Sequence, residues 1–205
     1  MGKTVLILGA TGRFGRHIGK AFEQAGWQLR RFDRKRDNLD QAAKGAQVIV
    51  AAWNPLYHHW AKQVPALHAE VRRVALANDA TVILPGNVYV YGPQMARHWD
   101  AQTPRLAKNP LGRIRIEMEL AYRRENVRTI LLRAGDFLDT EASGNWFDKI
   151  LTTSLPKGKL TYPGNPDIPH AWAYLPDLTR AAVMLANRRN ELDRFADIPF
   201  AGYTL

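Results

Sequence analysis

Short apolar runs alternate with amphipathic stretches along most of this chain. The nearly continuous apolar runs are typical of parallel strands that helices cover on both faces. We predict strands at residues 5–8, 28–32, 47–52, 81–84 and 127–132. The stretches between them repeat apolar positions at helical spacing and predict helices at 38–44, 61–78 and 111–124, besides one after the first strand. This alternation predicts right-handed βαβ units and an α/β fold, a doubly wound parallel sheet.

The pattern is less regular after residue 132. We expect a proline-broken loop at 93–110, a short helix at 148–155, a short strand at 159–162 and a helix from Pro176. Residues 195–205 look like a strand and the approach to a further element. Two alternatives stay open, a minimal form of the fold or a chain that lacks a C-terminal substrate-binding segment. The length of 205 residues fits a single domain, 1–205, with short substrate-pocket elements near the C-terminus.

Three glycines follow the first apolar run directly. Gly9, Gly12 and Gly15 lie where a strand turns into a helix that carries Phe14 and Ile18 on its apolar stripe. At such a turn, free backbone N–H groups and the positive end of the helix dipole face one point, which makes an anion site. The context favours the pyrophosphate of a dinucleotide. The alternative is a plain turn whose glycines serve only packing.

The end of the second strand bears on which dinucleotide binds. A carboxylate there accepts hydrogen bonds from a ribose 2′-OH, whereas an arginine one position later pairs with a 2′-phosphate or stacks on adenine. Both are present, as Asp33 and Arg34. The neighbouring Arg31, Lys35 and Arg36 favour NADP slightly over NAD. NAD held by Asp33 stays open, as does a simple solvated edge.

The Gly-x-x-Gly-x-x-Gly spacing, with Ala10 and Thr11 inside it, resembles the extended and atypical branches of the short-chain dehydrogenase/reductase superfamily, of the NAD-dependent epimerase/dehydratase type. This resemblance covers nearly the whole chain. It implies a Rossmann fold with a pocket above the strand ends. The cofactor contacts that it implies are Gly9, Ala10, Thr11, Gly12, Arg13, Phe14, Gly15, Asp33, Arg34, Ala51, Ala52, Trp53, Pro85, Gly86, Arg115, Ala134 and Gly135.

The catalytic motifs of these families are only partly present. In the family's Ser-Ser-x-x-Val-Tyr-Gly segment, Gly86 and Asn87 stand at the hydroxyl positions, and Tyr91 matches the tyrosine. The Tyr-x-x-x-Lys pair aligns with Leu111 and Arg115. Leucine has no proton to give, and arginine cannot act as a base. Asn87 could still donate a hydrogen bond or serve a turn, and Arg115 could hold a ribose.

The segment after the fifth strand resembles the family's loop at the nicotinamide. Ala134 and Gly135 would contact the carboxamide through their backbone, and Asp136 is either a polar contact or a turn former. His170 could be a substitute acid or base, because imidazole titrates near neutrality, or simply a packed or exposed histidine. The predicted substrate residues are Tyr57, His58, Asp136, Asn145, Trp146 and Trp172.

These features predict an NAD(P)-binding oxidoreductase or epimerase/dehydratase-like protein that acts on a small carbonyl or sugar-like substrate. The catalytic candidates are Tyr91, Asn87, Arg115 and His170. The proton could be handled by Tyr91, Tyr89, His170 or solvent. The alternative is a non-catalytic NAD(P)-binding sensor that acts through a protein partner, as related nitrogen-regulator-like proteins do.

Composition bears on which other kinds of ligand, site and location the protein can have. A net charge of +10 favours an anionic partner, but the charges are scattered, so nucleic acid is an unlikely ligand. There is no cysteine, which removes disulfides and thiolate chemistry, and the adjacent His58 and His59 make a poor metal pair, so we expect no metal. No apolar run approaches the roughly 20 residues of a membrane span. We expect a cytoplasmic protein, and the resemblance implies a homodimer.

Overall fold

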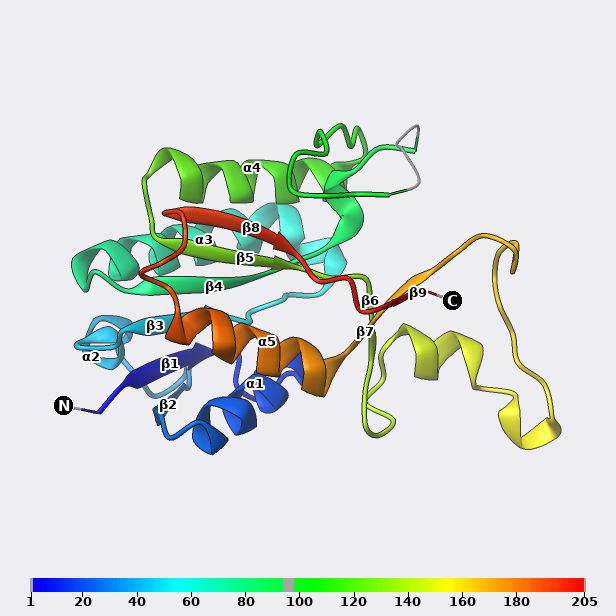
Figure 1. The fold of residues 1–205 in the computed structure, drawn as a ribbon, viewed down its shortest axis with the longest axis horizontal. Helices are drawn as coiled ribbons and strands as arrows, with labels where there is room; N and C mark the ends of the chain where they lie inside the picture. Colours follow the sequence, from blue (N-terminus) through cyan, green and yellow to red (C-terminus); the bar gives the residue numbers. More distant parts are fainter. Residues whose placement is uncertain (1, 94–97, 205) are drawn as a thin grey trace.

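The computed structural model of the protein describes residues 2–93 and 98–204. Its centre is a six-stranded sheet whose paired strands all run parallel (Figure 1). In spatial order the strands are β2 (Gln28–Phe32), β1 (Thr4–Leu8), β3 (Val48–Ala51), β4 (Thr81–Gly86), β5 (Thr129–Arg133) and β8 (Phe195–Pro199). The doubly wound parallel sheet predicted from the sequence is confirmed, and β2 has the predicted bounds.

Helices cover both faces of the sheet (Figure 1). The helices α1 (Arg13–Gln24) and α5 (Leu175–Asn187) pack on one face, and the other face carries α2 (Leu39–Ala43), α3 (Trp60–Ala77) and α4 (Pro110–Arg124). Side chains of β1 alternate between these layers: Val5 and Ile7 face α1, whereas Leu6 and Leu8 face α3. Because both faces are covered, even the alternate positions of a strand are apolar.

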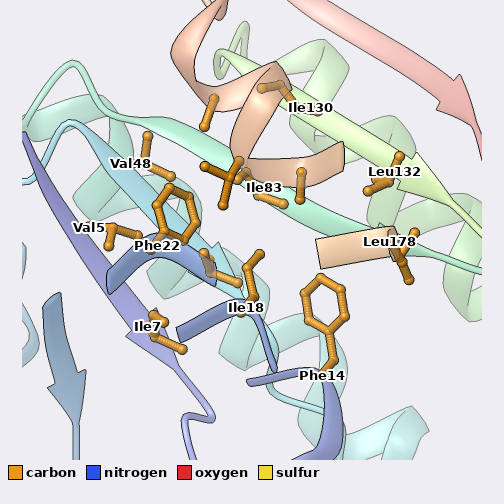
Figure 2. Close-up of a cluster of buried hydrophobic side chains, with 14 of the residues drawn as sticks. Val5, Ile7, Phe14, Ile18, Phe22, Val48, Ile83, Ile130, Leu132 and Leu178 are labelled. Carbon is orange, nitrogen blue, oxygen red and sulfur yellow. The ribbon is translucent and has the colours of Figure 1, made fainter. Parts of the chain in front are cut away.

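The core between the sheet and α1 explains why this helix begins where it does. Ile18 and Phe22 of α1 lie near Ile7 and Val5 of β1, whereas the ring of Phe14 points toward Leu178 of α5, and all belong to one buried cluster (Figure 2). Burying each such side chain stabilises the fold by about 1.5 to 3 kcal/mol. This packing fixes the first turn of α1 directly beyond the end of β1.

The strand order creates a crevice. The strands β2 and β3 lie on opposite sides of β1, so the chain leaves β1 in one direction and leaves β3 in the other. In open α/β sheets, ligands bind outside the carboxyl ends of the strands at such a switch point. The glycine turn after β1 and the loop after β3 therefore border the expected ligand position.

A second, smaller sheet lies beyond the carboxyl ends of the main strands (Figure 1, right). It contains β6 (Asp136–Leu138), β7 (Ala171–Tyr174) and β9 (Tyr203–Thr204). Between β6 and β7 the chain forms a π-helix (Phe147–Leu151) and a 3-10 helix (Leu155–Lys157) in place of the single helix predicted at 148–155.

The strand predicted at 159–162 is wrong. This segment has no strand partner. The Thr161 N–H instead donates to the Leu151 carbonyl oxygen at 3.0 Å, back onto the preceding π-helix. Residues 94–97 of the predicted loop at 93–110, and residue 205 of the final stretch, lie outside the described residues. Among the helices of the described ranges, none combines the length and the apolar character needed to cross a bilayer.

Candidate active-site cleft

A cleft of about 220 Å³ opens at the carboxyl ends of β1, β3, β4 and β5. It brings together segments that are far apart in the sequence. Of the predicted site residues it is lined by Arg13, Phe14, Ala51, Ala52, Trp53, Tyr57, Pro85, Gly86, Asn87, Arg115, Ala134, Gly135, Asp136, Asn145 and Trp146. These predicted cofactor and substrate residues thus share one cavity. The predicted cofactor residues outside its lining are Gly9, Ala10, Thr11, Gly12, Gly15, Asp33 and Arg34.

The glycine turn can be built only from glycine. Gly9 has a φ of 89°, and a Cβ there would lie 2.8 Å from the Ala52 carbonyl oxygen. A Cβ on Gly15 would lie 2.1 Å from the Gly9 carbonyl oxygen, closer than any real contact. The Gly12 N–H closes the turn by donating to the Gly9 oxygen at 3.1 Å. The turn therefore brings bare backbone to the mouth of the cleft.

The start of α1 suits an anion. Its N-cap is Gly12, which has no side chain to satisfy the first N–H groups, and its first turn carries no acidic residue. Arg13 and Arg16 lie there instead, where positive charge opposes the helix dipole. Arg16 donates to the Thr11 carbonyl oxygen at 3.0 Å, and Arg13 to that of Ser143 at 3.2 Å. A bound phosphate group would satisfy both the open N–H groups and the arginines, so these residues fit a dinucleotide.

At the end of β2, the side chains of Asp33 and Arg34 make different contacts. One Asp33 carboxylate oxygen accepts the Lys35 N–H at 2.9 Å, and the other lies 3.7 Å from Arg36 Nε, so Asp33 shapes its own turn. The Arg34 guanidinium lies 5.6 Å from the ring centre of Trp53, which lines the cleft. Arg34 is thus the member of the pair that reaches the cleft wall.

Arg115 is buried at the inner side of the cleft. Its Nη2 donates to the Pro85 carbonyl oxygen at 2.5 Å, and its guanidinium lies 5.9 Å from the ring centre of Trp60. Its Nε is buried and has no hydrogen-bond partner among the described residues. Burial lowers the pKa of Arg115, although the charge of Glu119 acts against this. Such an orphaned donor fits a ligand oxygen.

Two tyrosines meet on the cleft wall. The hydroxyl oxygens of Tyr57 and Tyr89 lie 2.8 Å apart, within hydrogen-bond distance. Burial, followed by the hydrogen bond and the proximity of Tyr57 and the charge of Asp136, raises the pKa of Tyr89, while the charge of Arg115 acts to lower it. Tyr89 therefore stays protonated at neutral pH.

Asp136 connects the cleft to His170. The Asp136 Oδ2 lies 2.9 Å from His170 Nε2, and His170 Nδ1 lies 2.9 Å from the Tyr162 hydroxyl. The rings of Trp146 and Trp172 stack with His170, with centroid distances of 5.2 and 4.3 Å. These contacts fix the carboxylate at the cleft and engage both nitrogens of the imidazole.

The loop that carries Asn145 and Trp146 is held by Asp148. One Asp148 carboxylate oxygen accepts the N–H groups of Ser143, Gly144 and Asn145 at 2.8 to 3.2 Å. In return, the Asn145 side-chain oxygen accepts the Asp148 N–H at 3.0 Å. The Asn145 Nδ2 is buried and has no partner among the described residues, which leaves a second donor available to a ligand.

Four of the predicted catalytic and substrate residues do not line the cleft. Tyr91 is buried elsewhere, with its ring on Trp99 and its hydroxyl 3.5 Å from the Asp100 carbonyl oxygen. His58 is exposed, and its ring centre lies 3.9 Å from that of His59, with the two rings tilted at 56°. His170 and Trp172 lie behind Asp136 and Trp146.

Sequence reasoning did not select four residues that line the cleft. They are Asn54, Trp60, Val88 and Phe137, whereas Tyr89, which also lines it, was named as a possible proton carrier. Asn54 and Trp60 lie in the aromatic stretch 53–60, which pointed to the correct segment but not to the inward-facing positions. Within the described residues no group of three or more histidine, aspartate or glutamate side chains could hold a metal ion.

Solved structures share the fold of this chain at low sequence identity. The NAD-dependent NDP-hexosamine 5,6-dehydratase TunA aligns with a TM-score of 0.79 and 13% identity, over 99% of this chain and 77% of its own. The UDP-N-acetylglucosamine 4-epimerase from Bacillus cereus gives 0.78 and 14%, over 99% and 77%. The GDP-D-glycero-L-gluco-heptose synthase from Campylobacter jejuni, in the presence of NADPH, gives 0.74 and 12%, over 100% and 82%.

Comparison of the sequence alone gives a different result. Neither a protein-family model nor a curated protein matches this sequence. The structural agreement spans nearly the whole chain. The chain therefore has a Rossmann-like fold, which it shares with the NAD-dependent dehydratase and the nucleotide-sugar epimerase.

Proposed function

We propose that this protein is an NAD(P)-dependent oxidoreductase or epimerase/dehydratase-like enzyme that acts on a small carbonyl or sugar-like substrate. The observation that carries the proposal is the uncapped start of α1, which opens into a cleft lined by further unpaired donors. The structural neighbours support it, because their names describe NAD-dependent or nucleotide-sugar enzymes.

Each part of the cleft has a task in this proposal. The turn from Gly9 to Gly15 holds the pyrophosphate, and the residues at the end of β2 hold the adenosine ribose. Arg115 and the backbone of 134–135 hold the nicotinamide half. The bound nicotinamide would supply a hydride to a carbonyl carbon or accept one from an alcohol carbon. Asp136 and Asn145 offer an acceptor and a donor to the substrate's oxygen groups.

Calorimetric titration with NAD, NADH, NADP and NADPH tests the cofactor site. We expect Gly15→Ala to weaken binding at least tenfold, because its Cβ would clash with the Gly9 oxygen. Gly19→Ala is the matched control on the same helix, since its Cβ would make ordinary contacts of 3.4 and 3.5 Å with side chains. The control should bind normally. Absence of binding by the unaltered protein would refute the proposed function.

Cofactor preference forms a second prediction. We propose that Arg34 recognises a 2′-phosphate, because its guanidinium lies on Trp53 while Asp33 is engaged in its turn. Arg34→Ala should weaken NADPH binding about tenfold, which corresponds to the loss of one charge-assisted contact. It should leave NADH binding nearly unchanged. The control is Arg31→Ala, which removes an exposed pair with Glu23. An equal effect on both cofactors would instead assign the recognition to Asp33.

A dinucleotide sensor is the second candidate function. Leu111, at the position of the family's tyrosine, packs against the core beside α3 and does not line the cleft. A protein that binds a cofactor without turning it over would need no proton donor. Absorbance at 340 nm distinguishes the two functions: an enzyme oxidises its bound NADPH or NADH when an aldehyde or ketone panel is added, whereas a sensor leaves the cofactor reduced.

A further inference from the structure

Tyr57 and Tyr89 form a continuous path from the inside of the cleft to solvent. Tyr57 begins the 3-10 helix η1 (Tyr57–His59), and Tyr89 is at the centre of the 3-10 helix η2 (Val88–Val90). Tyr57 is 54% exposed, whereas Tyr89 is half-buried. Their hydroxyls are 2.8 Å apart, and the ring of Trp60 lies 5.1 and 6.1 Å from the two rings.

The position of Tyr89 is fixed against the start of α4. A Cβ on Gly112 would lie 2.4 Å from the Tyr89 carbonyl oxygen, so the two backbones are in close contact. The Asn87 side-chain oxygen accepts the Tyr89 N–H at 3.1 Å and holds the turn. Gly112 is the neighbour of Leu111, the position at which these families carry their tyrosine. The backbone of Tyr89 thus lies at the end of the helix where these families carry their tyrosine.

We propose that Tyr89 exchanges a proton with the substrate oxygen and that Tyr57 relays this proton to solvent. This inference rests on the proposed oxidoreductase function and deepens it. In the reductive direction, the carbonyl carbon gains the hydride that the reduced cofactor supplies, and the carbonyl oxygen takes the proton of the Tyr89 hydroxyl. Tyr89 then takes the proton of Tyr57, and Tyr57 takes one from water. The sum is carbonyl, reduced cofactor and one proton to alcohol and oxidised cofactor.

The other candidate proton donors are less well placed. Tyr91 is 7% exposed and its ring packs between Trp99 and the guanidinium of Arg133, away from the cleft. His170 lies behind the cleft wall, and both of its ring nitrogens are engaged by Asp136 and Tyr162. We therefore assign His170 to positioning Asp136.

The charged groups around Tyr89 suit a proton donor. The groups that act on Tyr89 are Tyr57 of η1, Asp136 of β6 and Arg115 of α4. Burial and the first two raise the pKa of Tyr89 and keep its proton in place, and Arg115 offsets part of this. A phenol is still a stronger acid than the product alcohol, so it can protonate the alkoxide that forms when the carbonyl is reduced. The reductive rate should stay level between pH 6 and 9.

Single-turnover oxidation of bound NADPH or NADH tests the relay. The probes are glyceraldehyde, 4-nitrobenzaldehyde and cyclohexanone, and the readouts are absorbance at 340 nm, a pH profile and calorimetric cofactor affinity. Tyr89→Phe keeps the ring and should slow oxidation at least a hundredfold, within the range of general acid catalysis, with unchanged cofactor affinity. Tyr57→Phe should slow it about tenfold, because water must then reprotonate Tyr89 directly.

The control is Tyr203→Phe, which removes an exposed hydroxyl 3.2 Å from Asp177 and should leave the rate unchanged. A rate for Tyr89→Phe within threefold of the unaltered protein would overturn the relay, as would a rate that falls through neutral pH and depends on His170. Cofactor binding without oxidation of any probe would overturn the relay but keep the cofactor site. No cofactor binding at all would remove the proposed function itself.

Discussion

Replacing Arg133 with methionine should lower the free energy of unfolding by about 3 to 5 kcal/mol, because it leaves buried carboxylates without their partner. Arg133 ends β5 and is 3% exposed. Its Nη2 lies 2.8 Å from Glu119 and 2.9 Å from Asp197, and its Nη1 donates to the Asn87 carbonyl oxygen at 2.6 Å. Asp197 also pairs with Arg105. The four side chains form a neutral network that joins α4, β5 and β8.

Urea unfolding followed by circular dichroism measures the loss. The control is Arg188→Met, which removes an ion pair with Glu191 whose side chains are 69% and 60% exposed, and it should cost less than about 1 kcal/mol. Adding Glu119→Gln to Arg133→Met should recover part of the stability, since one uncompensated charge is removed. Equal losses for Arg133→Met and Arg188→Met would show that the network does not support the fold.

The network also bears on the cleft. Through its bond to the Asn87 carbonyl oxygen, Arg133 supports the turn that carries Tyr89. Loosening of this turn would move the hydroxyl relative to Tyr57 and Arg115. The structure alone shows that Glu119 pairs with Arg133, which lies 14 positions away on the next strand.

The main sheet could be predicted because its signals are local. Buried parallel strands need apolar side chains on both faces, so each run, such as that at 81–84, identifies its own strand. The glycine turn was equally readable, because the close approach of Gly15 to the Gly9 oxygen excludes every other residue. These two signals together located the carboxyl ends of β1 and β3 and therefore the cleft.

The small sheet and its loops could not be predicted in the same way. The short strand β6 pairs with β7, 36 positions further along at Asp136 and Trp172, and neither has enough residues to show a pattern of its own. At 159–162 an alternating pattern exists, but the segment pairs with no strand among the described residues. Strand formation there depended on distant partners, which a local pattern does not contain.

The cleft residues show the same division. Tyr89 and Tyr91 are two positions apart, and only the 3-10 turn at Val88–Val90 decides which hydroxyl faces the ligand. Likewise, the contact between Asp136 and His170 joins residues 34 positions apart. The candidate reactive side chains could be identified from the sequence. Which of them lie in contact depends on the turns and on the small sheet.

Acid should destabilise this protein through His68, by about 3 kcal/mol between pH 7 and pH 4. His68 of α3 is 2% exposed, and its Nδ1 lies 2.8 Å from the Tyr122 hydroxyl of α4. Burial, followed by the charges of Arg115 and Arg72, lowers the pKa of His68 to about 3 from an ordinary value of 6.5. Between these two values the unfolded chain binds a proton that the folded protein does not, so stability is full above pH 6.5 and falls as the pH decreases toward 3.

The pH dependence of urea unfolding isolates this effect when variants are compared, because other groups titrate in the same range. His68→Gln retains a hydrogen-bonding side chain but cannot be protonated, so its loss of stability between pH 7 and 4 should be smaller by about 3 kcal/mol. The matched control is His58→Gln on the exposed 3-10 helix, whose slope should follow that of the unaltered protein. A slope for His68→Gln as steep as that of the control would mean that His68 accepts its proton within the folded protein.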